Sequence, residues 1–242
     1  MSKAAALLDT SGGDTARATV PDEAGAPRRA ARPADLETEL RRRIARQIVP
    51  PGALLREVDI ADEFGVSRAQ VREAFVGLAL RGLIDRIPNK GAVVSRLDFD
   101  QIVEIFTVRE PLEGMCARLA AQNSTPDTWA PLVELFDEAM PRYLKEGDFE
   151  SFTETYQRFR LQIIEAASHR TLRDMLDSIG DKISVLTRRI IILPGRGEQA
   201  LKEHRAVLDA LHRGDGDAAE ALRKENMRSG LEWFVRYRNF VL

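Results

Sequence analysis

The chain has 242 residues, of which 44% are hydrophobic and 31% are charged, and its formal net charge at pH 7 is −2. These values are typical of a soluble globular protein of one large or two ordinary domains. The single cysteine, Cys116, excludes an internal disulfide framework and fits a reducing compartment. Because no apolar run approaches the roughly 18 residues of a membrane span and the N-terminal AAALL is too short for a signal peptide, we expect a cytoplasmic protein without a membrane partner.

The near-neutral total hides a division of charge along the chain. Residues 28–96 hold 14 Lys/Arg against 9 Asp/Glu, whereas residues 97–242 hold 20 against 25. Only the first segment is suited to a polyanion such as nucleic acid. An excess of this size also occurs on ordinary solvated surfaces, so charge alone does not decide between the two interpretations.

Residues 1–33 are rich in Ala, Gly, Pro, Thr and Arg and show no periodicity, so we expect a disordered tail. Helical periodicity begins near Pro33. Apolar residues then recur every four positions, as Leu36, Leu40, Ile44 and Ile48. This spacing predicts a first helix that stops before the sequence VPPG.

A helix, a glycine turn and a capped second helix follow. The helix over about residues 57–64 ends at Gly65, which can adopt the positive φ of a helix C-terminus. Ser67 is a strong N-cap residue, and Gln70 three positions later completes a capping box. The pattern predicts a helix-turn-helix.

The period changes after the second helix. Residues 83–87 and 92–94 are typical of two short strands around the turn Pro88-Asn89-Lys90-Gly91. A helix-turn-helix followed by a hairpin is a winged helix, which we assign to residues 34–96.

From Asp98 onward the pattern is helical throughout. The expected helices cover about residues 98–122, 127–145, 148–167, 170–192, 197–213 and 216–240. Residues 97–242 therefore predict an all-helical, six-helix bundle, and the fold class is mainly α.

Arg68 and Arg72 stand four residues apart near the start of the second helix of the helix-turn-helix. The apolar stripe of this helix leaves both arginines exposed, where a recognition helix contacts base edges and phosphates in the major groove of DNA. Lys90 at the hairpin tip can reach a phosphate or the minor groove, and Gly91 lets the backbone come close. For Arg72 the alternative is an ordinary surface salt bridge.

The segment LLREVDIADEFGVSRAQVREAFVGLALRGLI…NKGAVV resembles the DNA-binding domain of GntR-family bacterial transcription regulators. The family signature runs Val-Ser-Arg-x-x-Val-Arg-Glu-Ala-Leu, and here Phe75 replaces the final leucine. Where the family commonly has a DNA-contacting arginine, this chain has Val58, so either Arg56 substitutes for it or the base specificity differs. The resemblance implies that the DNA-contacting positions are Ser67, Arg68, Gln70, Arg72, Lys90 and Gly91.

The patterns VREPLEGMCARLAA and KEHRAVLDALHRGD resemble the FCD effector domain of the FadR-type branch of this family, over about residues 98–240. The resemblance implies a site for a small organic acid inside the bundle, and in many members a divalent metal held by an Asp and three His. The corresponding positions here are Tyr156, Arg160, His204 and Asn226. Because one histidine out of four ligands does not make a metal site, we expect no metal cofactor.

Two arginines of the helical region follow the apolar stripes of their helices, and a charge held there must be paired. Arg109 can pair with Glu113 four residues later, whereas position 164, four residues after Arg160, is Ile. We therefore expect a ligand carboxylate at Arg160. The full expected ligand-binding set is Arg109, Tyr156, Arg160, His204 and Asn226, with Arg189 as a weaker candidate.

Together these patterns predict a homodimeric, ligand-responsive regulator that binds operator DNA. By resemblance it is a repressor that a small organic or aromatic carboxylate releases. We expect no enzyme, because the sequence contains no nucleophile elbow, phosphate-binding glycine loop or His-Glu metal motif. The alternatives are a metal-dependent acid sensor of the same family and an architectural DNA-binding protein without an effector.

Overall fold

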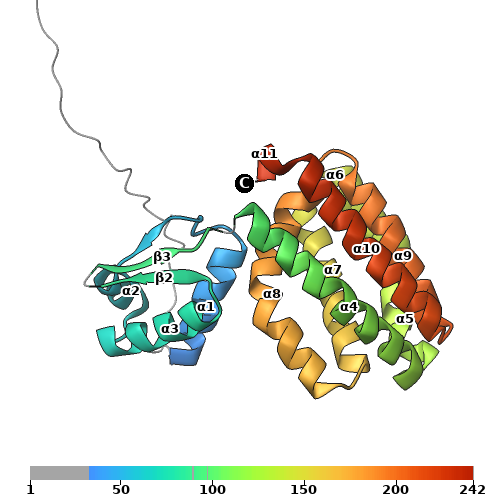
Figure 1. Ribbon diagram of the computed structural model, residues 1–242, viewed down its shortest axis with the longest axis horizontal. Helices are drawn as coiled ribbons and strands as arrows, with labels where there is room; N and C mark the ends of the chain where they lie inside the picture. The colour runs from blue at the N-terminus through green and yellow to red at the C-terminus, as the bar shows by residue number, and fades with distance from the viewer. Residues whose placement is uncertain (1–32, 89, 97, 242) are drawn as a thin grey trace, which may run out of the picture.

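The computed structural model describes residues 33–88, 90–96 and 98–241. Residues 1–32 of the expected disordered tail lie outside the described residues, whereas Pro33, its last residue, begins the first helix. The described chain forms an N-terminal winged helix-turn-helix and a C-terminal bundle of helices, which lie side by side (Figure 1).

The N-terminal domain packs three helices on a small sheet. The helices are α1 (Pro33–Ala45), α2 (Glu57–Phe64) and α3 (Arg68–Leu80), and the strands are β1 (Leu54–Leu55), β2 (Ile84–Ile87) and β3 (Gly91–Val94). The sheet is antiparallel with the order β1-β3-β2. The hairpin β2–β3 is confirmed, whereas β1 was not expected, because two residues are too few to show a strand period.

The core of this domain follows the predicted apolar stripes, with one exception. Leu36 and Leu40 are fully buried, but Ile48 is 45% exposed. The expectation that Ile48 continues the first helix is wrong, because α1 ends at Ala45 and Gln47 takes a positive φ of 56°. The helix-turn-helix itself is as predicted: Gly65 closes α2 at φ 64°, and α3 begins in a capping box.

The C-terminal domain is built from helices alone. They are α4 (Phe99–Asn123), α5 (Pro126–Glu134), α6 (Met140–Glu146), α7 (Phe149–Ala166), α8 (Arg170–Ile191), α9 (Arg196–His212), α10 (Gly216–Arg236) and α11 (Arg238–Val241). A single π-helical turn, η1 (Leu135–Ala139), splits the expected helix 127–145. Pro141 lacks the N–H that would continue regular bonding at this point, and the Met140 N–H bonds back to the Leu135 carbonyl instead.

The two domains meet where α8 passes α1 (Figure 1). Arg41 of α1 donates to Asp181 of α8 at 2.8 Å, and Arg46 donates to Glu154 of α7 at 2.5 Å. Helix α8 therefore touches the winged domain while the same helix contributes to the bundle. None of the described helices is both long and apolar enough to cross a membrane.

Candidate functional site

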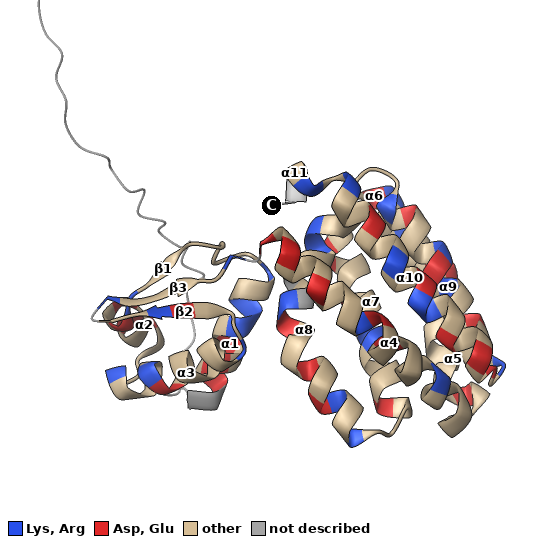
Figure 2. Cartoon of the chain, viewed as in Figure 1, with Lys and Arg blue, Asp and Glu red and all other residues tan. Residues whose placement is uncertain are grey.

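A basic groove runs between the start of α3 and the wing. Its walls bring together Arg56, Arg68, Arg72, Lys90 and Gly91, all of which were predicted DNA-contacting positions, and add Arg86 of β2. The side chains of Arg68 and Arg72 are 58% and 53% exposed. In Figure 2 the basic positions of α3 and of the wing lie at the end of this domain that is far from the bundle.

Glu57 of α2 lies between the two arginines of the recognition helix. Its carboxylate accepts from Arg72 Nε at 2.8 Å and from Arg68 Nη2 at 3.4 Å. The salt bridge considered for Arg72 is therefore present, yet both arginine side chains keep more than half of their surface exposed. The two exposed side chains can contact a phosphate or a base while Glu57 holds them together.

Three of the predicted positions shape the backbone of this surface. Ser67 Oγ accepts from the Gln70 N–H at 3.3 Å, and Gln70 Oε1 accepts from the Ser67 N–H at 2.9 Å. Gly91 has φ +108°, and a Cβ there would lie 2.2 Å from the carbonyl oxygen of Leu55. The close approach that requires this glycine is thus the one between β3 and β1.

The five predicted ligand-binding residues are all buried in the helical domain, and each is at most 4% exposed. Arg160 differs from the expectation. Its Nε donates to Glu113 Oε1 of α4 at 2.7 Å, so a protein carboxylate partners it. Arg160 also does not line the cavity beside this cluster. The sequence did not predict Glu113 as the partner of Arg160, because the two residues are 47 positions apart.

Arg223 of α10 holds the central place in the cluster and was not predicted. It is fully buried, and its Nη2 donates to Glu113 Oε2 at 2.6 Å and to Tyr156 Oη at 3.3 Å. Its Nη1 donates to Asn226 Oδ1 at 3.1 Å. A sequence signal existed, because Arg223 lies on the buried stripe of α10 between Ala219 and Met227.

The positions at which the resemblance implies metal ligands do not fit a metal here. They hold Tyr156, Arg160, His204 and Asn226, and a guanidinium group bonds to two of them. No group of three or more His, Cys, Asp or Glu side chains among the described residues is placed to hold a metal ion. The cation that bonds to both Tyr156 and Asn226 is Arg223.

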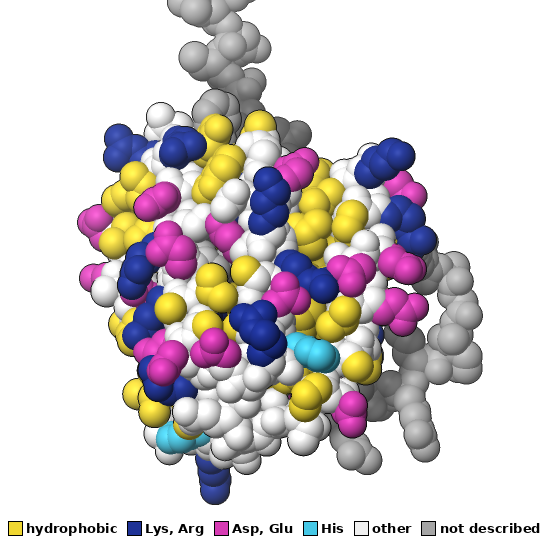
Figure 3. All heavy atoms as spheres, turned by 90° about the vertical axis from the view of Figure 1, so that its right-hand side faces the viewer, with side chains coloured by type: hydrophobic (Ala, Val, Ile, Leu, Met, Phe, Trp, Pro, Cys, Tyr) yellow, Lys and Arg dark blue, Asp and Glu magenta, His cyan; other side chains and the backbone are white. Residues whose placement is uncertain are grey.

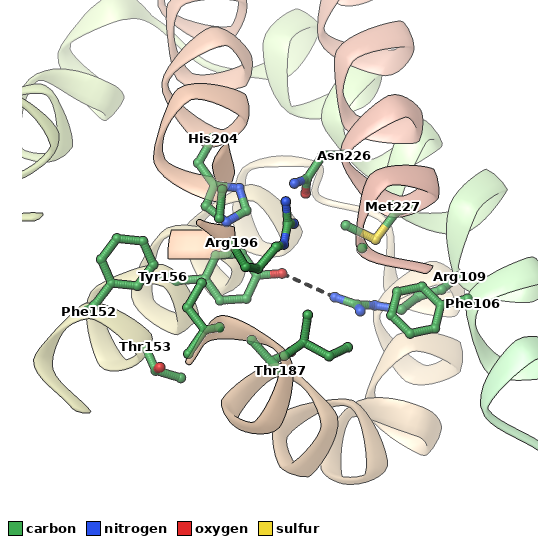
Figure 4. A pocket seen from close by; sticks show the side chains of 14 residues that line it. Phe106, Arg109, Phe152, Thr153, Tyr156, Thr187, Arg196, His204, Asn226 and Met227 are labelled. Atoms are coloured by element: carbon green, nitrogen blue, oxygen red, sulfur yellow. Dashed lines mark hydrogen bonds between the residues drawn. The ribbon is translucent and has the colours of Figure 1, made fainter. Parts of the chain in front are cut away.

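A small cavity of about 40 Å³ lies beside the cluster (Figure 4). Its polar walls come from Arg109, Tyr156, His204 and Asn226, together with Arg196 at the start of α9. Arg196 was not predicted, and its Nη1 donates to Glu203 at 3.0 Å and to Ser229 Oγ at 3.2 Å. The apolar walls are Phe106, Phe152, Ile190, Ile191 and Met227.

The ionisation of the cluster follows from burial and from the arginine charges. Burial by itself would raise the pKa of Glu113, but the attraction of Arg160, Arg223 and Arg109 outweighs it and holds that pKa well below its usual value. Burial, together with the nearby charges of Arg223 and Arg196, lowers the pKa of His204 well below its usual value. The carboxylate is therefore charged and the imidazole neutral.

The remaining candidates lie elsewhere. Arg189 lines the space between the two domains and is absent from the walls of the cavity inside the bundle. Cys116 is buried in the hydrophobic core. At the far end of the helical domain, basic and acidic side chains are interspersed with apolar ones (Figure 3), in contrast to the basic groove of the winged domain.

Comparisons with known proteins match both halves of the chain. Residues 34–94 match bacterial regulatory proteins of the gntR family, and residues 104–229 match the FCD domain. The chain is 33% identical over 178 residues to a probable D-xylose utilization operon transcriptional repressor of Paenarthrobacter nicotinovorans, which covers 73% of this chain and 77% of that protein. It is 28% identical over 191 residues to the HTH-type transcriptional repressor RspR of Escherichia coli K12, with 78% and 82% covered. The solved structure of E. coli McbR/YncC shares the fold, with a TM-score of 0.74 over 85% of this chain and 98% of that chain at 24% identity.

Proposed function

The chain belongs to the GntR family of bacterial transcription regulators and carries an FCD domain, and we propose that it is a homodimeric repressor that a small organic acid releases from its operator. Members of this family are DNA-binding regulators rather than enzymes. The observation that supports the effector half of the proposal most strongly is the buried, arginine-lined cavity in the helical domain.

The groove between α3 and the wing is the DNA-binding surface in this proposal. Arg68 and Arg72 present planar donors at the N-terminal end of α3, which suits guanine edges and phosphates in the major groove. Lys90 and Arg86 add positive charge from the wing. One such domain covers a half-site, so two copies related by a two-fold axis would read a near-palindromic operator.

The cavity in the bundle is the effector site. Arg109 and Arg196 line it, and none of the described residues on its wall is an Asp or a Glu. Two buried guanidinium groups on the wall of a cavity favour an anionic ligand, because Arg109 shares the single carboxylate of Glu113 with Arg160 and Arg223 and its charge is only partly compensated. The assignment as a repressor is supported by the names of two relatives, a probable transcriptional repressor of Paenarthrobacter nicotinovorans and a transcriptional repressor of E. coli.

The DNA-binding half of the proposal is tested with Arg72→Ala. We expect the specific affinity for an operator fragment, selected from genomic DNA with the wild-type protein, to fall about 10- to 100-fold, since a good bidentate base contact contributes about 1–3 kcal/mol. The measurement is a fluorescence-anisotropy titration. The unfolding temperature should stay unchanged, because the side chain is half exposed.

The matched control is Arg170→Ala, which removes a 94%-exposed arginine from the helical domain. It should leave operator affinity unchanged. An Arg72→Ala protein that binds the operator as tightly as the wild type would contradict the assignment of this groove.

A further inference from the structure

The buried charges of the helical domain do not balance. Among the described residues, the buried charged side chains are four arginines and one glutamate: Arg109, Arg160, Arg196, Arg223 and Glu113. Glu113 alone pairs with three of them, at 3.0 Å from Arg109, 2.7 Å from Arg160 and 2.6 Å from Arg223. Glu203, whose side chain is 11% exposed, pairs with Arg196. Four positive charges thus face two negative ones.

The four arginines cannot relieve this excess of two charges by losing protons. An arginine stays protonated in proteins, and an unpaired charge in the interior costs several kcal/mol. Tyr156 gives partial relief, because its phenol oxygen accepts from Arg109 Nη2 at 3.1 Å and from Arg223 Nη2 at 3.3 Å. Even so, the cluster is suited to an added anion.

The excess charge borders the cavity. Arg109 reaches it from α4 and Arg196 from the start of α9, and Figure 4 shows both guanidinium groups beside the same space, at different points of its wall. Each arginine leaves donors that take no part in the hydrogen bonds of the described residues, since Arg109 uses Nε and Nη2, and Arg196 uses Nη1.

A second observation also points to a ligand. His204 lines the cavity and is 4% exposed, yet its Nδ1 is buried without a hydrogen-bond partner. Buried polar atoms in native proteins are almost always bonded, and an exception calls for an explanation. A polar group of a bound molecule would supply the missing partner.

We propose that the effector carries two anionic groups, as a small dicarboxylate does, and that Arg109 and Arg196 each hold one of them. This inference rests on the proposed function and narrows it. The apolar wall of Phe106, Ile190 and Met227 suits the hydrocarbon segment between the two groups. A ligand with one negative charge would leave one excess charge of the cluster unpaired.

The test compares ligands that differ by one charge. The full-length chain, treated with EDTA, is titrated by calorimetry with malonate, succinate, glutarate and adipate, and with the monomethyl ester of each. At least one diacid should bind about 10- to 100-fold more tightly than its own monoester, as is typical of a close buried charge pair. Phosphoglycolate and inorganic phosphate test whether a phosphate supplies the second charge.

Arg196→Gln removes one charge from the site. The ratio between diacid and monoester should then fall towards one. The matched control is Arg228→Gln on α10, which removes an arginine that is 52% exposed and paired with Glu110, and it should keep the wild-type ratio. If Arg196→Gln does not fold, the ratio of diacid to monoester affinity in the wild type still tests whether the effector carries two anionic groups.

The outcomes separate the two proposals. Equal binding of a diacid and its monoester would overturn the dianion proposal and leave an acid-responsive repressor in place. Binding of phosphoglycolate or phosphate alone would overturn the dicarboxylate assignment. Binding of none of these probes would count against both proposals for this cavity.

Discussion

At the residue scale, Tyr156 connects the buried charges to pH. Burial by itself would raise the pKa of its phenol, but the charges of Arg223 and Arg109 outweigh burial and lower that pKa below its usual value of about 10. The folded chain therefore releases this proton at a lower pH than the unfolded chain does. Between the two pKa values the unfolded state binds more protons than the folded state. The free energy of unfolding therefore increases as the pH rises through this range.

We expect this gain to vanish in Tyr156→Phe. The difference in free energy of unfolding between wild type and variant should grow as the pH rises through the folded pKa towards about 10, and should shrink again as the pH falls. Urea denaturation at a series of pH values measures it. A difference that stays constant over this range would mean that the arginines do not favour the ionised phenol.

The same cluster shows which side-chain contacts can be predicted from the sequence and which cannot. The pairing of Arg109 with Glu113 was weighed from their spacing of four residues, and it is present at 3.0 Å. The bonds from Arg160 and Arg223 to Glu113 cross 47 and 110 residues. Helical periodicity shows that these arginines face inward, but it carries no information about which distant acid they meet.

At the scale of elements, the short strand β1 lies so close to the wing that position 91 requires a glycine. Gly91 pairs with Ile87 in the hairpin, and the Leu55 carbonyl oxygen occupies the space that a Cβ of residue 91 would need. In Gly91→Ala the new methyl group would lie 2.2 Å from that oxygen at a φ of +108°. We expect a loss of about 1–3 kcal/mol in the free energy of unfolding, together with weaker operator binding because Lys90 is displaced.

Gly65→Ala is the matched control, since Gly65 also has a positive φ, of 64°, but a Cβ there meets nothing within 4 Å. It should cost only the backbone strain of about 1–2 kcal/mol and leave the wing in place. Chemical denaturation and anisotropy titration of the two variants make the comparison. Equal effects on DNA binding would show that the contact with β1 does not hold the wing.

Elements differ in how well the sequence predicts them. The capping box of Ser67 and Gln70 and the long helices of the bundle were predictable, because local hydrogen bonds and sustained apolar stripes determine them. The strand β1 and the π turn η1 were not. Two residues show no period, and the π turn arises inside a helical pattern that continues through it.

At the scale of the whole molecule, α8 links the cavity to the winged domain. Thr187, Ile190 and Ile191 line the cavity, while Asp181 of the same helix accepts from Arg41 of α1 at 2.8 Å and lies 3.7 Å from Arg81, which follows α3. Ile190 follows Asp181 by nine helical steps, which is a rise of about 14 Å. A ligand that shifts α8 would thereby change how the winged domain is held, provided that it binds the two arrangements with different affinity.

Asp181→Asn tests this link. It keeps the shape of the side chain and removes the charge that Arg41 and Arg81 share across the domain boundary. These pairs are partly exposed, so we expect a loss of stability on the order of 1 kcal/mol or less. The coupling factor is the ratio of operator affinities with and without the ligand. We expect the substitution to reduce this factor more than it changes either the operator affinity without ligand or the ligand affinity without DNA. Because coupling between two sites is reciprocal, titration with DNA and titration with the acid should show the same reduced coupling factor.

The matched control is Asp174→Asn, which alters an exposed acid on α8 that pairs only loosely with Arg170 at 3.9 Å. It should leave the coupling factor as it is in the wild type. Anisotropy titrations of the operator at several concentrations of the bound acid give that factor for each protein. An Asp181→Asn protein with full coupling would show that the signal reaches the DNA-binding domain by contacts other than this bridge, and the ion pair between Arg46 and Glu154 would be the next contact to remove.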